Sequence, residues 1–228
     1  MNFFRTALVV MAKDLRAELR TKEAINASLA FAVVILLLFS FAFVDELDTE
    51  TTRSLSGGLL WIVFAFAGTL LLNRSFAREL PNDCLDALIA APVPGAALFL
   101  GKALANYVLV LAIEMISLVV FGVFYNIHWT SRFGDLMMVV ALGSWALTVI
   151  GTIFSALTVN IRLREVMLPM LTYPILVPAL MAAMQLTVPL ISGNPIPPEM
   201  ERWLKMLIGF DIIYTAVSLF VAETVLVG

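Results

Sequence analysis

Six long runs of apolar residues, separated by shorter polar stretches, dominate this sequence. The runs cover about residues 24–44, 57–73, 96–125, 136–158, 166–188 and 204–226. Each is long enough to cross the hydrocarbon core of a bilayer, which is about 30 Å thick. Lipid offers no hydrogen-bond partners to the backbone, and no short alternating strands are visible, so each run is predicted to be a helix. We therefore expect an all-α integral membrane protein with six transmembrane helices, in which residues 1–228 form a single transmembrane domain.

The residues before the first run predict a further helix at the membrane surface. Apolar side chains recur there at spacings of three and four, at Phe4, Leu8, Met11, Leu15 and Leu19. Basic residues occupy another face, at Lys13, Arg16 and Arg20. This pattern over residues 2–22 is typical of an interfacial amphipathic helix with its apolar side in lipid. The alternative is a basic flank that only sets the topology.

Lys and Arg are distributed unequally between the two ends of the predicted spans. If the N-terminus is cytoplasmic, that side carries Arg5, Lys13, Arg16, Arg20, Lys22, Arg74, Arg78, Arg162 and Arg164. The other side carries only Arg53, Arg132, Arg202 and Lys205. Positively charged connections stay in the cytoplasm, so we expect a multi-pass protein with both termini cytoplasmic.

Composition agrees with a membrane protein and excludes several kinds of site. The chain is 61% hydrophobic and 14% charged, against about 45–50% and 25% in soluble domains. Its single cysteine, Cys84, and single histidine, His128, allow neither an internal disulfide nor a metal site of several such ligands. We interpret Cys84 as an inert thiol, and His128, beside Trp129, as part of a membrane anchor rather than a haem contact. No G-x-x-x-x-G-K-[ST] phosphate loop is present, so the chain is not expected to bind ATP by that device, and any energy must come from a partner or an ion gradient.

Residues 74–95 form a charged segment between the second and third spans. Residues 75–79 are expected to continue the second helix into water, and residues 80–83 to form a turn. A short helix should then run to residue 91, with Leu85, Leu88 and Ile89 on one side, and end at Pro92 and Pro94. Its apolar side either docks in a groove of another protein or rests on lipid headgroups.

Polar residues and prolines inside the spans are further candidates. Glu114 falls near the middle of the third span, and Asp211 in the outer half of the last. An ionised acid at the position of Glu114 costs on the order of 2.5–3.5 kcal/mol, so Glu114 is expected to face a partner or be protonated. Glu114 is either a proton or cation site or, as we favour, a hydrogen-bonded packing residue. The fifth span holds Pro169, Pro174 and Pro178, which either kink the helix or are ordinary membrane prolines.

The order of these features resembles that of ABC-2-type (type V exporter-like) permeases, and more closely the CcmB family of cytochrome c maturation permeases. Short strings in order carry the resemblance: Asp14-Leu15-Arg16, Gly58-Leu59-Leu60-Trp61, Asn73-Arg74-Ser75-Phe76-Ala77-Arg78, Asp83-Cys84-Leu85-Asp86-Ala87-Leu88, Pro92-Val93-Pro94 and Gly101-Lys102-Ala103-Leu104-Ala105. The resemblance covers about residues 4–182. The last quarter is apolar and not diagnostic.

The resemblance implies a non-catalytic half-permease of a bacterial-type inner membrane. It would bind no cofactor directly, and would pair with itself and with two copies of an ABC ATPase subunit. In the family's complex these stand with a haem-handling membrane protein and a small helical subunit. ATP would bind the ATPase and haem the partner proteins, and hydrolysis would release a haem-loaded chaperone at the outer face. The short helix of residues 84–91 would then couple to the ATPase through Leu85, Leu88 and Ile89, with polar contacts from Arg78, Glu79, Asp83 and Asp86. Two alternatives remain open: an ABC-2-type exporter of a lipid, drug or glycan, and an ion-coupled carrier using Glu114.

Overall fold

The computed structural model of this protein describes residues 2–43, 49–80, 93–125 and 129–227. Within those ranges no strand is present, and the helices are α1 (Phe3–Thr21), α2 (Glu23–Phe43), α3 (Thr49–Leu72), α5 (Gly95–Phe124), α6 (Phe133–Thr158), α7 (Arg164–Ile191) and α8 (Glu201–Val227). Short 3-10 turns lie at η1 (Ala77–Glu79), η3 (Trp129–Arg132) and η4 (Pro198–Met200). All the α-helices except α1 are long and apolar enough to cross a membrane, and they number six in the described residues. The predicted all-α, six-helix class is confirmed.

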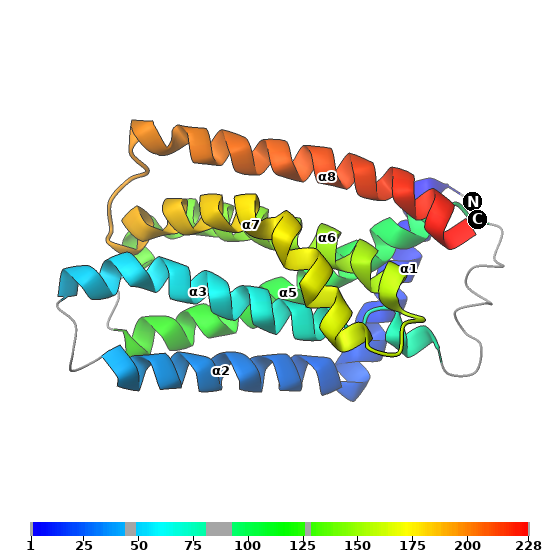
Figure 1. Ribbon diagram of the computed structural model, residues 1–228, viewed down its shortest axis with the longest axis horizontal. Coiled ribbons are helices and arrows are strands. Elements are labelled where there is room, and N and C mark those ends of the chain that lie inside the picture. Colours follow the sequence, from blue (N-terminus) through cyan, green and yellow to red (C-terminus); the bar gives the residue numbers. More distant parts are fainter. Residues whose placement is uncertain (1, 44–48, 81–92, 126–128, 228) are drawn as a thin grey trace.

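The six long helices run along the long axis of the molecule, and both termini lie at the same end (Figure 1). α2 and α8 lie on opposite sides of the bundle. The most apolar stretch of α6 is 72% buried within the protein, whereas those of α2 and α8 are 28% and 22% buried. α6 is therefore the central helix, and α2 and α8 leave most of their surface for lipid or a partner.

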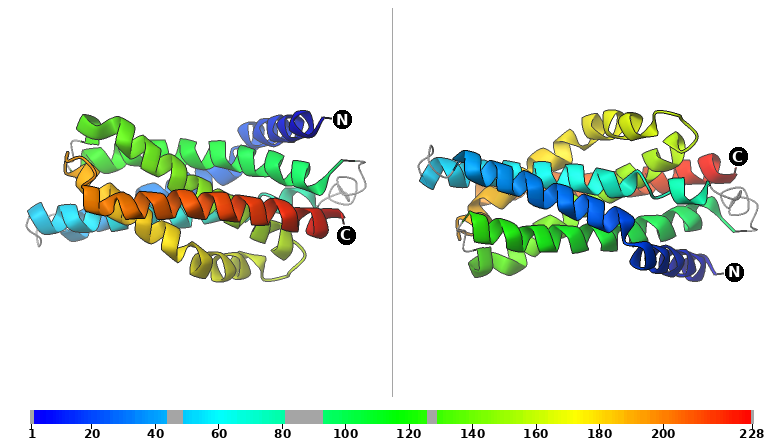
Figure 2. Two further views of the ribbon diagram at one scale, coloured as in Figure 1. Left: turned by 90° about the horizontal axis from the view of Figure 1, so that it is seen from above. Right: turned by 90° about the horizontal axis from the view of Figure 1, so that it is seen from below.

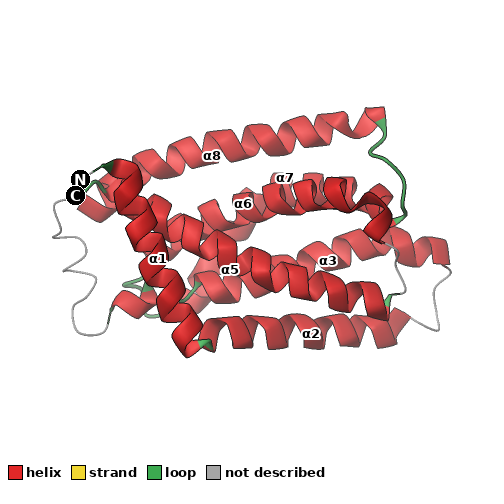
Figure 3. Ribbon diagram, turned by 180° about the vertical axis from the view of Figure 1, so that it is seen from behind, coloured by secondary structure: helices red, strands yellow, loops and turns green. Residues whose placement is uncertain are grey.

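α1 runs across the end of the bundle, crosswise to α2 (Figure 3). Its outward side carries Phe4 and Leu8, which are 70% and 58% exposed. Its inward side packs on α5, where a Cβ atom added to Gly101 would lie 2.6 Å from the carbonyl oxygen of Ala7. The structure therefore shows a helix here that belongs to the folded body, and its position at a membrane interface stays a prediction.

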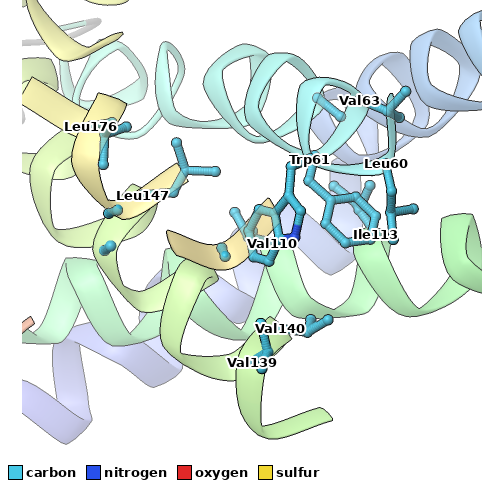
Figure 4. Close-up of a cluster of buried hydrophobic side chains, with 14 of the residues drawn as sticks. Leu60, Trp61, Val63, Val110, Ile113, Val139, Val140, Leu147 and Leu176 are labelled. Carbon is cyan, nitrogen blue, oxygen red and sulfur yellow. The ribbon is translucent and has the colours of Figure 1, made fainter. Parts of the chain in front are cut away.

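Trp61 of α3 stands at the centre of the main hydrophobic cluster (Figure 4). Its indole is fully buried, and its Nε1 donates a hydrogen bond of 2.8 Å to Oγ1 of Thr187 on α7. Gly143 on α6 lies against the ring, where a side chain would collide with it. Small residues allow such close approach between helices in a membrane, where packing rather than water exclusion holds them together.

α7 changes direction along its length (Figure 1), and its first half stands away from the bundle (Figure 2). Pro169 and Pro174 lie in this half, and Pro178 lies just after it. Each proline lacks the N–H group that would bond to the preceding turn, and its ring crowds that turn's carbonyl, so the helix bends. Of the two interpretations of these prolines, the structure favours the kinked helix.

The second span ends earlier than the sequence suggests. We predicted that residues 75–79 would continue its helix into water, and this is wrong, because α3 ends at Leu72 and the chain turns through residues 73–76 into η1. Oγ of Ser155 on α6 donates a 2.8 Å hydrogen bond to the carbonyl oxygen of Leu72, and Phe76 is buried in a second apolar cluster. The burial of Phe76 keeps this turn against the bundle.

Candidate functional site

The described part of the segment between α3 and α5 lies at the end of the bundle that α1 crosses. This part comprises residues 74–80 and 93–95. The predicted coupling residues Asp83, Leu85, Asp86, Leu88 and Ile89, together with Cys84, lie outside the described residues. Arg78 and Glu79 lie inside them, and their surroundings define the candidate site.

The centre of the site is Lys102 on the second turn of α5, a lysine with no exposed side-chain surface. Its Nζ donates to Oδ2 of Asp14 and to Oε1 of Glu79, both at 2.9 Å, and to the carbonyl oxygen of Ser75 at 3.2 Å. An ammonium group has three N–H donors, so this one is fully used. The Phe76 ring lies 4.8 Å from Nζ and supplies a cation–π contact. A buried charge needs such compensation, since taking it out of water costs several kcal/mol.

Lys13 on α1 balances the charges around Lys102. Its Nζ lies 2.5 Å from Oε1 of Glu79 and 3.1 Å from Oδ1 of Asp14. Partial burial by itself lowers the pKa of Lys13, but the hydrogen bond to Glu79 and the charges of Asp14 and Glu79 outweigh that effect and raise it. Two lysines thus face two carboxylates. We call these four residues, Lys13, Asp14, Glu79 and Lys102, the charge cluster.

A second set of ion pairs ties the same turn to α2. Arg78 pairs with Glu18 of α1, whose carboxylate is fully buried. The other oxygen of Glu18 accepts a 3.0 Å hydrogen bond from the backbone N–H of Ile25, in the first turn of α2. Arg74 pairs with Glu23, the first residue of α2. Carboxylates at the start of α2 also suit the positive end of its helix dipole.

A polar chain continues from the turn into the membrane bundle. Nδ2 of Asn106 on α5 donates to Oγ of Ser75 at 2.8 Å and to Oγ1 of Thr152 on α6 at 3.0 Å. At the other edge of the segment, Oε2 of Glu223 near the end of α8 accepts a 2.9 Å hydrogen bond from the N–H of Ala96. Residues 74–80 and the start of α5 are therefore joined to α1, α2, α6 and α8.

The two acids inside the bundle are placed as buried side chains. Glu114 is 2% exposed, and Oγ of Ser144 on α6 donates a hydrogen bond to its Oε2. Asp211 is 7% exposed. Oε1 of Glu114 and both carboxylate oxygens of Asp211 have no hydrogen-bond partner in the described ranges. Glu114 thus has the interhelical partner expected of a packing residue. The described residues include no group of three or more potential metal ligands.

Comparison with known proteins identifies the family. The sequence model described as "CcmB protein" matches residues 5–227. The chain belongs to this family.

Individual relatives agree with the family match. "Heme exporter protein B" of Rhodobacter capsulatus is 29% identical over 177 residues, covering 78% of this chain and 80% of the relative. The protein of the same description from Paracoccus denitrificans is 29% identical over 171 residues, covering 75% and 77%. The one from Pseudomonas aeruginosa is 24% identical over 221 residues, covering 96% and 97%. The similarity to the CcmB family therefore extends into the last quarter of the chain, which by eye was not diagnostic.

Sequence reasoning assigned Arg78 and Glu79 of this CcmB family member to polar contacts with an ATPase. The structure brings both into contacts within the chain, and no finding tests the external contact, which stays a prediction. Sequence reasoning missed the roles of Lys13, Asp14, Glu18 and Asn106 in this site. One signal was available: Lys102, within an apolar helix, requires an acidic partner, and Asp14 is an acid in a motif shared with the family.

Proposed function

We propose that this chain is the membrane permease subunit of an ABC transporter for c-type cytochrome biogenesis. In this proposal ATP hydrolysis by a separate ATPase subunit drives haem handling and the release of a haem-loaded chaperone at the outer face. Membership of the CcmB family and the names of the relatives support it. The chain itself transmits force and catalyses no reaction.

The proposed assembly contains two copies of this chain and two ATPase subunits in the inner membrane. A haem-handling membrane protein and a small helical subunit complete it. The ATPases meet the cytoplasmic end of the bundle, where α1, η1 and both termini lie. Leu85, Leu88 and Ile89 enter a groove of the ATPase, and Asp83 and Asp86 make polar contacts at its rim. Arg78 and Glu79 add polar contacts with the ATPase on the side of the segment nearer the bundle.

One observation carries the proposal: the segment that would meet the ATPase is joined to the membrane helices by buried charges. Glu79 contacts Lys102 on α5 and Lys13 on α1, and Arg78 contacts Glu18. A displacement of the segment is therefore passed to α5 and to α1 together. A flexible connector without such contacts would absorb the displacement instead.

The experiment tests docking with apolar-to-acidic substitutions. The double variant Leu85→Asp with Leu88→Asp places charge on the apolar side of the helix predicted for residues 84–91, and we expect it to abolish co-purification of the ATPase. Leu163→Asp is the matched control, because Leu163 is 68% exposed at the same end of the bundle but lies between α6 and α7. Full recovery of the ATPase with the double variant would show the docking assignment to be wrong.

The short-helix variants, together with Glu114→Gln, also separate the proposed permease from an ion-coupled carrier. A buried Glu114 with one unpartnered oxygen is the observation that favours a carrier. In a carrier, Glu114→Gln abolishes activity and the short-helix variants are harmless. In the permease proposed here the reverse holds, and an ABC-2-type exporter of another cargo is recognised by ATPase docking without any effect on cytochrome c maturation.

A further inference from the structure

A hollow of about 720 Å³ lies between the start of α2, the end of α3 and the start of α7. Three arginines line it, Arg74, Arg78 and Arg164, against two acids, Glu23 and Glu165. The start of α7, which contributes Arg164, Glu165 and Val166 to the lining, belongs to the part of α7 that stands away from the bundle (Figure 2). Neither the charge cluster nor the intramembrane acids line this hollow.

The hollow has unused capacity to bind an anion. Arg164 has no ion-pair partner in the part of the chain that the structure describes. Arg74 and Arg78 each pair with one carboxylate, through one nitrogen. A guanidinium group carries five N–H donors in a planar fork that matches phosphate, so donors remain on both. Arg164 is also the first residue of α7, where the helix dipole is positive.

The surroundings of the hollow favour a lipid over a soluble phosphate. It lies where three helices long enough to span a membrane begin or end, and in a bilayer the ends of such helices meet the lipid headgroups. Apolar side chains continue from it along the first turns of α7, at Val166 and Met170, which are 62% and 65% exposed. Basic pockets between transmembrane helices at this depth are known to bind anionic headgroups.

We propose that this hollow binds the headgroup of an anionic phospholipid, with Arg164 and Arg74 contacting the phosphate. The acyl chains then lie along the exposed side of α7, between Val166 and Met170. This lipid fills the space left by the bend of α7 and joins α7 to α2 and α3. The site depends on the chain being in a membrane and not on its cargo or its ATPase.

The test measures lipid binding to the purified full-length protein in detergent by native mass spectrometry. The probes are dioleoyl phosphatidylglycerol, dioleoyl phosphatidylcholine and, as a soluble phosphate, glycerol 3-phosphate. We expect phosphatidylglycerol to bind more tightly than phosphatidylcholine. Arg164→Gln should weaken phosphatidylglycerol binding about fivefold, the effect of one basic side chain near an anionic lipid surface, and leave phosphatidylcholine unchanged.

Two further variants protect the test against misfolding. Glu165→Gln removes an acid that lines the hollow and should tighten phosphatidylglycerol binding, a gain that a misfolded protein would not produce. Arg202→Gln, at the opposite end of the bundle, should change nothing. Equal affinity for the two lipids, or no change with Arg164→Gln and Glu165→Gln, overturns the proposal. Equal competition by glycerol 3-phosphate also overturns it, because the site would then take free phosphate.

Discussion

At the scale of single residues, Lys102 is the side chain on which the candidate site depends most. It joins one residue from α1, one from η1 and the backbone of the turn after α3, all from a position with no exposed surface. Deleting one member of a buried ion cluster leaves the others with uncompensated charge, and this costs more than the intact cluster gains. The arrangement of α1, η1 and α5 is thus specified by one amino group.

Lys102→Met is therefore expected to lower the free energy of unfolding by about 3 kcal/mol. Asp14 and Glu79 would then share only Lys13, at the cost of their mutual repulsion. The measurement is unfolding in mixed detergent micelles, followed by tryptophan fluorescence. Lys205→Met is the control, because Lys205 is 77% exposed and its pair with Glu201 contributes less than about 1 kcal/mol. Equal effects of the two variants would contradict a central role for Lys102.

The spans and the fold class could be predicted from the sequence because they depend on local patterns. A run of some twenty apolar residues and the signs of the connecting charges predict the spans and the fold class without knowledge of packing. The partners of Lys102 are not local, since Asp14 and Glu79 lie 88 and 23 residues away. Nor could the sequence alone show that residues 75–79 leave the helix, because the burial of Phe76 against other helices decides that.

At the scale of elements, the contact of α1 with α5 is the joint that unites the interfacial helix with the bundle. The helices approach closely at Gly101, beside Ala7 and Val10. Residue 101 is glycine because there is no room for a side chain. The atom that a Cβ would meet is a main-chain oxygen, which cannot turn aside as a side chain can. Lys102, the member of the charge cluster on α5, is the next residue, so close packing and ion pairing act at the same place.

Gly101→Val should separate α1 from α5. The added Cβ would lie 2.6 Å from the Ala7 carbonyl oxygen and 2.7 Å from Cβ of Val10, so α1 must move. Overpacking of this kind costs about 1–3 kcal/mol. Limited digestion with trypsin measures the result, because Arg16 and Arg20 are exposed on α1 and cleavage after them requires the helix to open, which a detached α1 does more readily. Gly209→Val is the control, since no atom lies within 4 Å of the added Cβ there. Equal digestion of the two variants would show that α1 does not depend on this contact.

At the scale of the whole molecule, the ion pairs between distant parts of the chain gather at one end in the described residues. The charge cluster, the Arg78–Glu18 pair, the Arg74–Glu23 pair and both termini all lie there. The opposite end has two exposed pairs between close sequence neighbours, Arg132–Asp135 and Lys205–Glu201, among the described residues. A displacement applied at this end would move several helices together, whereas no ion pair joins different α-helices at the other end in those ranges.

The orientation of this end decides whether an ATPase could reach it, and Cys84 tests this directly. It is the only cysteine in the chain and lies between α3 and α5, in the segment proposed to face the cytoplasm. Because basic connections stay in the cytoplasm, we expect a membrane-impermeant maleimide to label Cys84 only after the cells are opened. The double variant Cys84→Ser with Ser192→Cys moves the thiol to the opposite end of the bundle, just after α7. This thiol should be labelled in intact spheroplasts. Labelling of Cys84 from outside would place the charge cluster away from any cytoplasmic ATPase and exclude it as the site of coupling.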